Sequence, residues 1–182
     1  MTVRTLKPVP ATPEALAPFG YWLGSDAPAE VGRSAFYGDT VELRKPSKFV
    51  GDDTLDITVA TCHRRPMEVS WLERHFLHTQ TFIPLGGKPF VLVLCPPTEG
   101  DMPNLDDARA FHFDGSAGLA MHLGTWHEFP LPLEDDTNVI VLIRKDTARD
   151  LTKVQGNEAH GPDLDKKDIV ARTGVTLQVD LA

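Results

Sequence analysis

The chain has 182 residues, of which 41% are hydrophobic and 24% charged, a composition typical of one globular domain spanning 1–182. Its formal net charge of −8 argues against nucleic acids and anionic membranes as partners, because no basic surface is available to neutralise phosphates. No apolar run approaches the roughly 20 residues of a membrane span, and residues 1–20 lack the apolar core of a signal peptide. We therefore expect a cytoplasmic protein. A small anionic substrate stays compatible with this charge, since one local cation can bind it.

The start of the chain predicts one short helix. In the stretch TPEALAPFG, Thr12 is a good N-cap, Pro13 suits the first helical position and Gly20 can end the helix. Beyond it, fifteen prolines and fourteen glycines divide the chain into short segments. This punctuation favours a mostly β fold.

The strands are predicted from short apolar or alternating segments bounded by turn residues. They cover residues 54–62, 67–75, 80–85, 89–95, 108–114, 118–123, 125–131, 138–144 and 174–181. A spacing of about ten residues per strand is typical of a sandwich or a barrel. Several apolar side chains are interpreted as lining or packing of that barrel: Phe82, Leu92, Leu94, Ile140 and Leu142.

Two segments, 24–53 and 145–172, are less regular and rich in polar residues. Neither is interpreted as a domain linker, since strands resume after both. The stretch at 156–168 lacks the regular Asp spacing and closing Glu of a calcium-binding loop, so we interpret it as a solvated loop or a dimer arm. Cys62 and Cys95 have no motif spacing, and we expect two buried reduced thiols rather than a disulfide.

The stretch LERHFLHTQTFIPLGG concentrates side chains that bind metals or transfer protons. In a strand, Glu73 and His75 point to the same face and Arg74 points to the other. After a short turn, Gln80 would begin an adjacent strand and converge with Glu73 and His75. His78 lies within the turn, where we expect it to be solvated.

A second stretch, GLAMHLGTWHEFPL, follows about fifty residues later. Gly124 allows a tight turn, and His127 opens the next strand. His122 alternates inward before the turn, which fits a site residue and a structural residue equally well. Trp126 fits the core or an interface better than the wall of a ligand pocket.

The spacing of these stretches resembles the two metal-binding motifs of the cupin family. His75 and His127 match two of the four usual ligands, while Glu73 and Gln80 stand where cupins have His and Glu. Glutamate is a competent metal ligand and glutamine a weaker one. The resemblance implies a divalent metal site (nickel, manganese or zinc) formed by these four residues, with a metal-free site as the alternative.

A closer resemblance is to the ureidoglycolate lyases of allantoin degradation, also called ureidoglycolate hydrolases. It rests on LERH followed by TQ.F.P, on the WH.PL segment and on the opening helix PEALAPFG. It spans roughly residues 5–146, whereas the tail from 147 is longer and more polar than expected for that family. The resemblance implies a cupin-type β-barrel of the RmlC-like jelly-roll class, usually a homodimer, that cleaves ureidoglycolate to glyoxylate and urea.

This cleavage needs a base for the hydroxyl proton and an acid for the departing urea nitrogen, and histidine can do either near neutral pH. We expect His75 or His127 to be the base, with Glu73 holding an imidazole or taking the proton itself. Gln80 would bond the ureido or carboxylate group. The remaining candidates for substrate binding are Arg74, His122 and Trp126. For Arg74, a structural ion pair is favoured over a substrate clamp.

Two other functions remain open from the sequence. One is a metal-dependent cupin enzyme, such as a dioxygenase or an isomerase, acting on another small hydroxy or ureido acid. The glutamine at position 80 argues against it. The other is a non-catalytic cupin that binds a small carboxylate, which predicts ligand binding without turnover. Fold alone does not decide between them.

Overall fold

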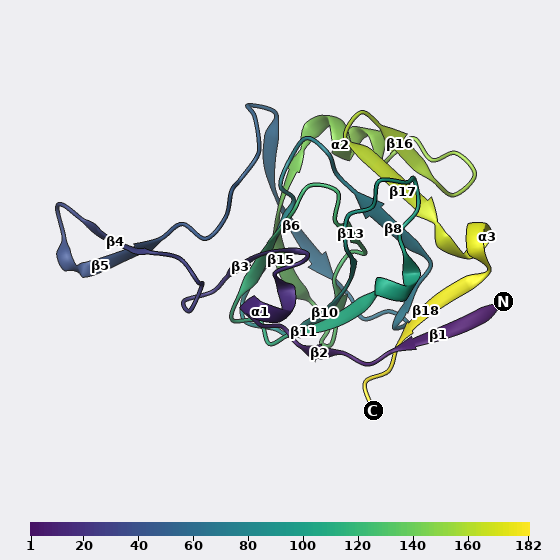
Figure 1. Ribbon diagram of the computed structural model, residues 1–182, viewed down its shortest axis with the longest axis horizontal. Coiled ribbons are helices and arrows are strands. Elements are labelled where there is room, and N and C mark those ends of the chain that lie inside the picture. Colours follow the sequence, from purple (N-terminus) through teal and green to yellow (C-terminus); the bar gives the residue numbers. More distant parts are fainter.

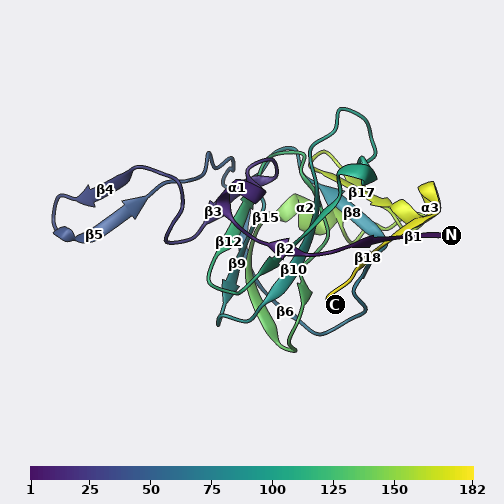
Figure 2. The same cartoon turned by 60° about the horizontal axis from the view of Figure 1, so that its bottom comes forward.

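The computed structural model describes residues 1–182 and is mostly β, as predicted. Two sheets face each other across the core (Figures 1 and 2). The eight-stranded sheet contains, in spatial order, β16 (Ala159–Gly161), β17 (Leu164–Asp168), β8 (Trp71–Arg74), β13 (Trp126–His127), β10 (Phe90–Cys95), β11 (Arg109–Phe113) and β2 (Val9–Pro10), with β14 (Leu131–Pro132) also pairing with β10. The five-stranded sheet contains β3 (Gly20–Leu23), β12 (Gly118–Met121), β9 (Thr81–Leu85), β15 (Thr137–Arg144) and β6 (Leu55–Cys62). The two sheets are hydrogen-bonded separately, so the expected barrel is an open, jelly-roll-like sandwich.

The remaining elements flank this sandwich. A three-stranded sheet joins the two ends of the chain, because β1 (Thr2–Leu6) pairs in parallel with β18 (Val175–Val179), which also pairs with β7 (Glu68–Val69). The helices are α1 (Pro13–Leu16), α2 (Lys145–Asp150), α3 (Ile169–Thr173) and the 3₁₀ turn Leu105–Asp107. No helix has both the length and the apolar character needed to cross a bilayer.

Strand β10 separates two hydrophobic clusters. Its alternate residues Phe90, Leu92 and Leu94 join a cluster of 17 buried residues between the two large sheets. Its other face joins a cluster of 12 buried residues beneath the three-stranded sheet through Val91, Val93 and Cys95. Burial on both faces explains why this strand is a continuous apolar run. Cys62 and Cys95 are buried and unpaired, as predicted.

The predicted helix is present but shorter than expected. Thr12 caps α1 by accepting a hydrogen bond from the backbone N–H of Ala15 at 3.2 Å. The helix ends at Leu16, because Pro18 has no N–H to extend the pattern. Gly20, predicted to terminate the helix, instead begins β3.

All nine predicted strands are present, with two interruptions. The segment 67–75 is split at Ser70 into β7 and β8, which belong to different sheets. The segment 125–131 is split into β13 and the start of β14.

The orientation of β15 differs from the prediction. Ile57 and Val59 of β6 are 75% and 58% exposed, and they lie opposite Leu142 and Ile140 of β15 on the outer face of the sheet. The interpretation of Ile140 and Leu142 as barrel lining is therefore wrong. The inward face of β15 carries Val139, Val141 and Ile143 instead.

The two polar segments are more structured than expected. Residues 24–53 contain a hairpin of β4 (Val31–Ser34) and β5 (Gly38–Arg44) that projects away from the sandwich (Figures 1 and 2). The solvated-loop interpretation of 156–168 is wrong, because β16 and β17 extend the eight-stranded sheet beside β8. The polar composition suggested exposure to water, yet Asp165 and Lys167 of β17 are buried, and Asp165 pairs with both Arg74 and Lys167.

Candidate functional site

Three neighbouring strands bring charged and basic side chains together on one face. Glu73 on β8 lies opposite His127 of β13 on one side and opposite Lys166 of β17 on the other. His75 follows directly after β8. Glu73, His75 and His127 are 4%, 3% and 1% exposed. A buried carboxylate and two buried imidazoles in contact are a strong candidate for a chemical site.

Glu73 uses its two oxygens in different directions. Its Oε1 lies 3.5 Å from His127 Nε2 and 3.8 Å from His75 Nε2. Its Oε2 accepts a hydrogen bond from Lys166 Nζ at 2.9 Å. The distances to the imidazoles exceed those of ordinary hydrogen bonds, which leaves a gap between three potential ligand atoms.

Backbone carbonyls fix the tautomers of both histidines. His75 Nδ1 lies 3.1 Å from the carbonyl oxygen of Asp163, and His127 Nδ1 lies 3.0 Å from that of Thr125. A carbonyl only accepts hydrogen bonds, so each Nδ1 carries the proton and each Nε2 of the neutral ring has a lone pair. Both Nε2 atoms are buried without a hydrogen-bond partner.

The donor set of the cluster fits a divalent metal ion. Gln80 Oε1 is also buried and unpartnered, and Gln80 lines the same cavity as Glu73. Buried acceptors without donors are costly, whereas a cation can satisfy several at once. The ligand atoms of Glu73, His75 and His127 lie within 4.8 Å of one another, close enough to share one ion. Gln80 reaches the cavity from just before β9 in the opposite sheet, not from a strand adjacent to β8 as expected.

The surroundings set the charges of the cluster. Burial raises the pKa of Glu73, but His127, His75 and Lys166 more than offset this and hold the pKa of that carboxyl well below its usual range. Burial lowers the pKa of His127 despite the neighbouring carboxylate. Burial also disfavours the charged form of Lys166, yet the carboxylates of Glu73 and Glu128 raise its pKa overall. At neutral pH the cluster therefore contains an ionised Glu73, a neutral His127 and a charged Lys166.

The remaining predicted site residues lie outside this cluster. Arg74 pairs with Asp165 at 3.1 Å, and its guanidinium lies 4.2 Å from the ring of Trp126. Trp126 is fully buried in the smaller hydrophobic cluster. His122 Nε2 lies 3.0 Å from the carbonyl oxygen of Ala17, near α1.

A cavity of about 240 Å³ opens beside the cluster. Its polar side chains are Glu73, Gln80, Lys166 and Thr58 of β6. Its apolar wall comes from β6 and β15 of the five-stranded sheet, a loop residue and α2 with its following turn: Ala60, Val141, Ile143, Phe129, Ala148 and Leu151. Drug-sized ligands typically occupy roughly 300–1,000 Å³, so this volume suits a smaller metabolite.

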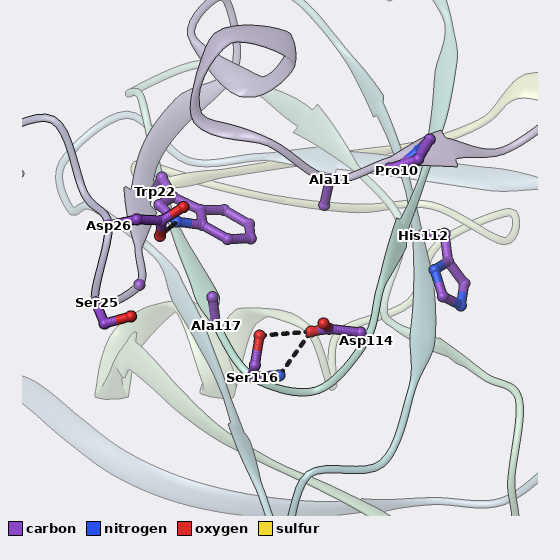
Figure 3. A pocket seen from close by; sticks show the side chains of 10 residues that line it. Pro10, Ala11, Trp22, Ser25, Asp26, His112, Asp114, Ser116 and Ala117 are labelled. Atoms are coloured by element: carbon purple, nitrogen blue, oxygen red, sulfur yellow. Dashed lines mark hydrogen bonds between the residues drawn. The ribbon is translucent and has the colours of Figure 1, made fainter.

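A different hollow of about 560 Å³ lies between β2, β3 and β11 (Figure 3). Its carboxylates already have partners, since Trp22 Nε1 donates to Asp26 at 2.6 Å and Ser116 Oγ donates to Asp114 at 2.6 Å. None of the predicted site residues lines it. We therefore place the candidate site at Glu73 and its histidines.

Comparison with known proteins identifies the family of the chain. A family model described as ureidoglycolate lyase matches residues 3–160. The chain belongs to the ureidoglycolate lyase family. Proteins named ureidoglycolate lyase from Pseudomonas fluorescens (strain Pf0-1) and Pseudomonas putida (strain W619) are 36% and 35% identical to it over 150 residues. Each of these alignments covers 78% of this chain and 86% of the relative.

In this member of the ureidoglycolate lyase family, residues beyond the matched range contribute to the site. His78 is 1% exposed, so the prediction that it is solvated is wrong. Its Nδ1 donates to Asp163 at 2.6 Å, and Asp163 also accepts hydrogen bonds from Thr147 Oγ1 and the N–H groups of Phe76 and Leu77. Burial raises the pKa of Asp163, but the hydrogen bonds from His78 and Thr147 bring it well below its usual range.

Sequence reasoning missed Asp163 and Lys166. Both lie in the polar stretch 156–168, for which the sequence predicts a solvated loop or a dimer arm, and no apolar alternation marks β17 as a strand. The one usable signal was the density of charged residues in DLDKKD, which would suit a strand whose neighbours are also charged.

Proposed function

We propose that this protein is a ureidoglycolate lyase that cleaves ureidoglycolate to glyoxylate and urea in allantoin degradation. The observation that carries the proposal is the convergence of Glu73, His75 and His127 beside a small cavity, in a chain of the ureidoglycolate lyase family. The substrate carbon bears a carboxylate, a hydroxyl and a ureido nitrogen, and each of these groups needs a partner in the site.

The imidazoles supply the proton transfers of this proposal. An Nε2 lone pair of His75 or His127 takes the hydroxyl proton, and the carbon–oxygen double bond forms as the carbon–nitrogen bond breaks. The same imidazole returns the proton to the departing nitrogen, which leaves as urea, so protons and electrons balance. Glu73 stabilises the transient imidazolium, since its Oε1 faces both rings. Gln80 Oε1 accepts a hydrogen bond from the ureido N–H.

We also propose that this donor set holds a divalent ion such as nickel, manganese or zinc. Its ligands would be Glu73 Oε1, the Nε2 atoms of His75 and His127, and Gln80 Oε1. When bound, such an ion polarises the substrate oxygens as a Lewis acid. The same lone pairs serve as ligands or as proton acceptors, so activity with and without metal decides between the two roles.

Assembly and location form part of the proposal. We place the protein in the cytoplasm as a single-domain homodimer without nucleic-acid or membrane partners. The exposed Ile57 and Val59 on the outer face of β6 support association, because a second copy packed against this face would cover them. Light scattering coupled to gel filtration measures the mass; a monomer at micromolar concentration would refute the dimer.

The test of function is turnover of racemic ureidoglycolate by the purified protein. Glyoxylate and urea are measured together, after chelation and after addition of each metal, because ammonia in place of urea would indicate a hydrolase. Glu73→Ala, His75→Ala and His127→Ala are each expected to lower kcat by about 10²- to 10⁴-fold while the circular dichroism spectrum is retained. His63→Ala is the matched control, since His63 is an exposed histidine outside the cavity. Absence of turnover under every metal condition would refute the proposed function.

A further inference from the structure

Lys166 is placed at the site by a segment outside the range that matches the family. The match to the family model ends at residue 160, whereas β17 begins at Leu164. The register of β17 on β8 sets Lys166 directly opposite Glu73. Neither of the two sequence stretches that identify the family contains this lysine.

The ammonium of Lys166 has hydrogen-bonding capacity left over. It carries three donors, and its one hydrogen-bond acceptor in the structure is Glu73 Oε2, at 2.9 Å. The side chain is 28% exposed and lines the cavity of about 240 Å³. A lysine that served only to neutralise Glu73 would need no opening toward the cavity.

Lys166 is the one basic residue that lines this cavity. The nearby arginines are engaged elsewhere: Arg65 pairs with Glu128 at 3.1 Å, and Arg74 pairs with Asp165. An anion that enters the cavity therefore meets the charge of Lys166 first. The opposite wall is apolar and offers a carboxylate no hydrogen bonds.

We propose that Lys166 binds the carboxylate of the substrate and so fixes which 2-hydroxy acids the enzyme accepts. This inference rests on the proposed function, because it assigns the group that recognises the carboxylate of ureidoglycolate. With the carboxylate at Lys166, the adjacent carbinol carbon lies on the side of Glu73, whose Oε1 contacts both imidazoles. The C-terminal segment thus supplies substrate recognition, while the two family stretches supply the chemistry.

The first experiment compares two fragments of the substrate by titration calorimetry on the full-length protein. Glycolate retains the carboxylate and hydroxyl; hydroxymethylurea retains the hydroxyl and ureido groups. Lys166→Met is expected to weaken glycolate binding about 10- to 100-fold, the usual range for a charged hydrogen bond, and to leave hydroxymethylurea within about twofold. Lys166→Arg keeps the charge and should recover most of the loss. An equal loss for both fragments would mean that Lys166 only positions Glu73, and would overturn the proposal.

Lys145→Met is the matched control. Lys145 also pairs with a carboxylate, Asp56 at 3.7 Å, but its side chain is 61% exposed and it does not line the cavity. Binding of both fragments should be unchanged in this variant. In turnover assays, Lys166→Met should raise KM about 10- to 100-fold with kcat changed much less.

A second measurement needs no variant and stays decisive if Lys166→Met does not fold. Wild-type protein should bind glycolate at least about tenfold more tightly than glycolamide, its neutral amide, because only the carboxylate has a full charge to pair. Equal affinities would overturn the assignment of Lys166. Turnover of ureidoglycolate by the wild type tests the proposed function separately. An active enzyme without carboxylate preference refutes the inference alone.

Discussion

Replacement of Asp163 by asparagine is expected to destabilise the protein strongly, although the two side chains are nearly isosteric. Asp163 is 3% exposed. Its Oδ1 accepts the N–H groups of Phe76 and Leu77 at 2.8 and 2.5 Å, and its Oδ2 accepts His78 Nδ1 and Thr147 Oγ1, both at 2.6 Å. All four partners donate, so an asparagine NH₂ on either side faces two donors.

The magnitude follows from the number of hydrogen bonds lost. Asparagine keeps one oxygen and therefore two of the four hydrogen bonds. Each lost bond to a charged group contributes about 1.5–3 kcal/mol, which predicts a loss of about 3–6 kcal/mol in the free energy of unfolding. For a chain of this size, that corresponds to a fall of roughly 6–24 °C in Tm.

Urea denaturation at pH 7 measures this loss, and its pH dependence tests the cause. Hydrogen bonds hold the pKa of Asp163 below its usual range. A depressed pKa in the folded state stabilises the protein above the unfolded pKa of about 4, and the contribution falls as the pH drops below that value. The gap between wild type and Asp163→Asn should therefore narrow below about pH 4.

Asp39→Asn is the control, because Asp39 forms an exposed ion pair with Arg33 in the β4–β5 hairpin. It should change the free energy of unfolding by at most about 1 kcal/mol. A loss below about 1 kcal/mol in Asp163→Asn would refute the reasoning, since the four hydrogen bonds would then contribute little.

Three further predictions concern other parts of the molecule. Hydrogen bonds from Arg172 lower the pKa of Glu158 to about 2, so Glu158→Gln should lose about 1–2 kcal/mol in the free energy of unfolding at pH 7. In chemical denaturation, the difference between this variant and the wild type should disappear as the pH falls from about 4.5 to 2. A difference that stays constant with pH would contradict the ion pair. Burial raises the pKa of Cys95 to about 12, so a thiol-specific reagent at pH 8 should label Cys95 only after unfolding. Rapid labelling of Cys95 in the native protein would refute its burial. Leu94→Ala should lower the free energy of unfolding by about 2–5 kcal/mol in urea denaturation, because the Leu94 side chain is fully buried between the sheets. Leu181 is 55% exposed, so Leu181→Ala should lower it by less than about 0.5 kcal/mol. Similar losses in both variants would refute this packing.

The sequence was sufficient to predict that Glu73, His75 and His127 converge, but not which residues surround them. Strand alternation sets Glu73 and His75 together, and the turn at Gly124 brings His127 beside them. Gln80 was expected to reach the cavity from a strand adjacent to β8, but it precedes β9, which belongs to the facing sheet. Pairing between distant strands is not encoded in local periodicity, so Lys166 could not be assigned to the site.

The fold shows the same limit at two places. Apolar alternation identified β6 as a strand, yet Ile57 and Val59 point outward. The inward face of β6 carries the small side chains Thr58 and Ala60, which line the cavity and leave room for a ligand. In β17, Asp165 is buried against the opposite charge of Arg74 on β8, although a hydropathy pattern would place such a carboxylate in solvent.

The double burial of β10 has a consequence for how the protein unfolds. Because this strand is the shared wall of both hydrophobic clusters, neither cluster can open without exposing it. Its amide protons should exchange with solvent only when the whole sandwich opens, whereas those of the projecting β4–β5 hairpin should exchange by local fluctuation. The two clusters would then form one cooperative unit, and calorimetry should record a single transition for both.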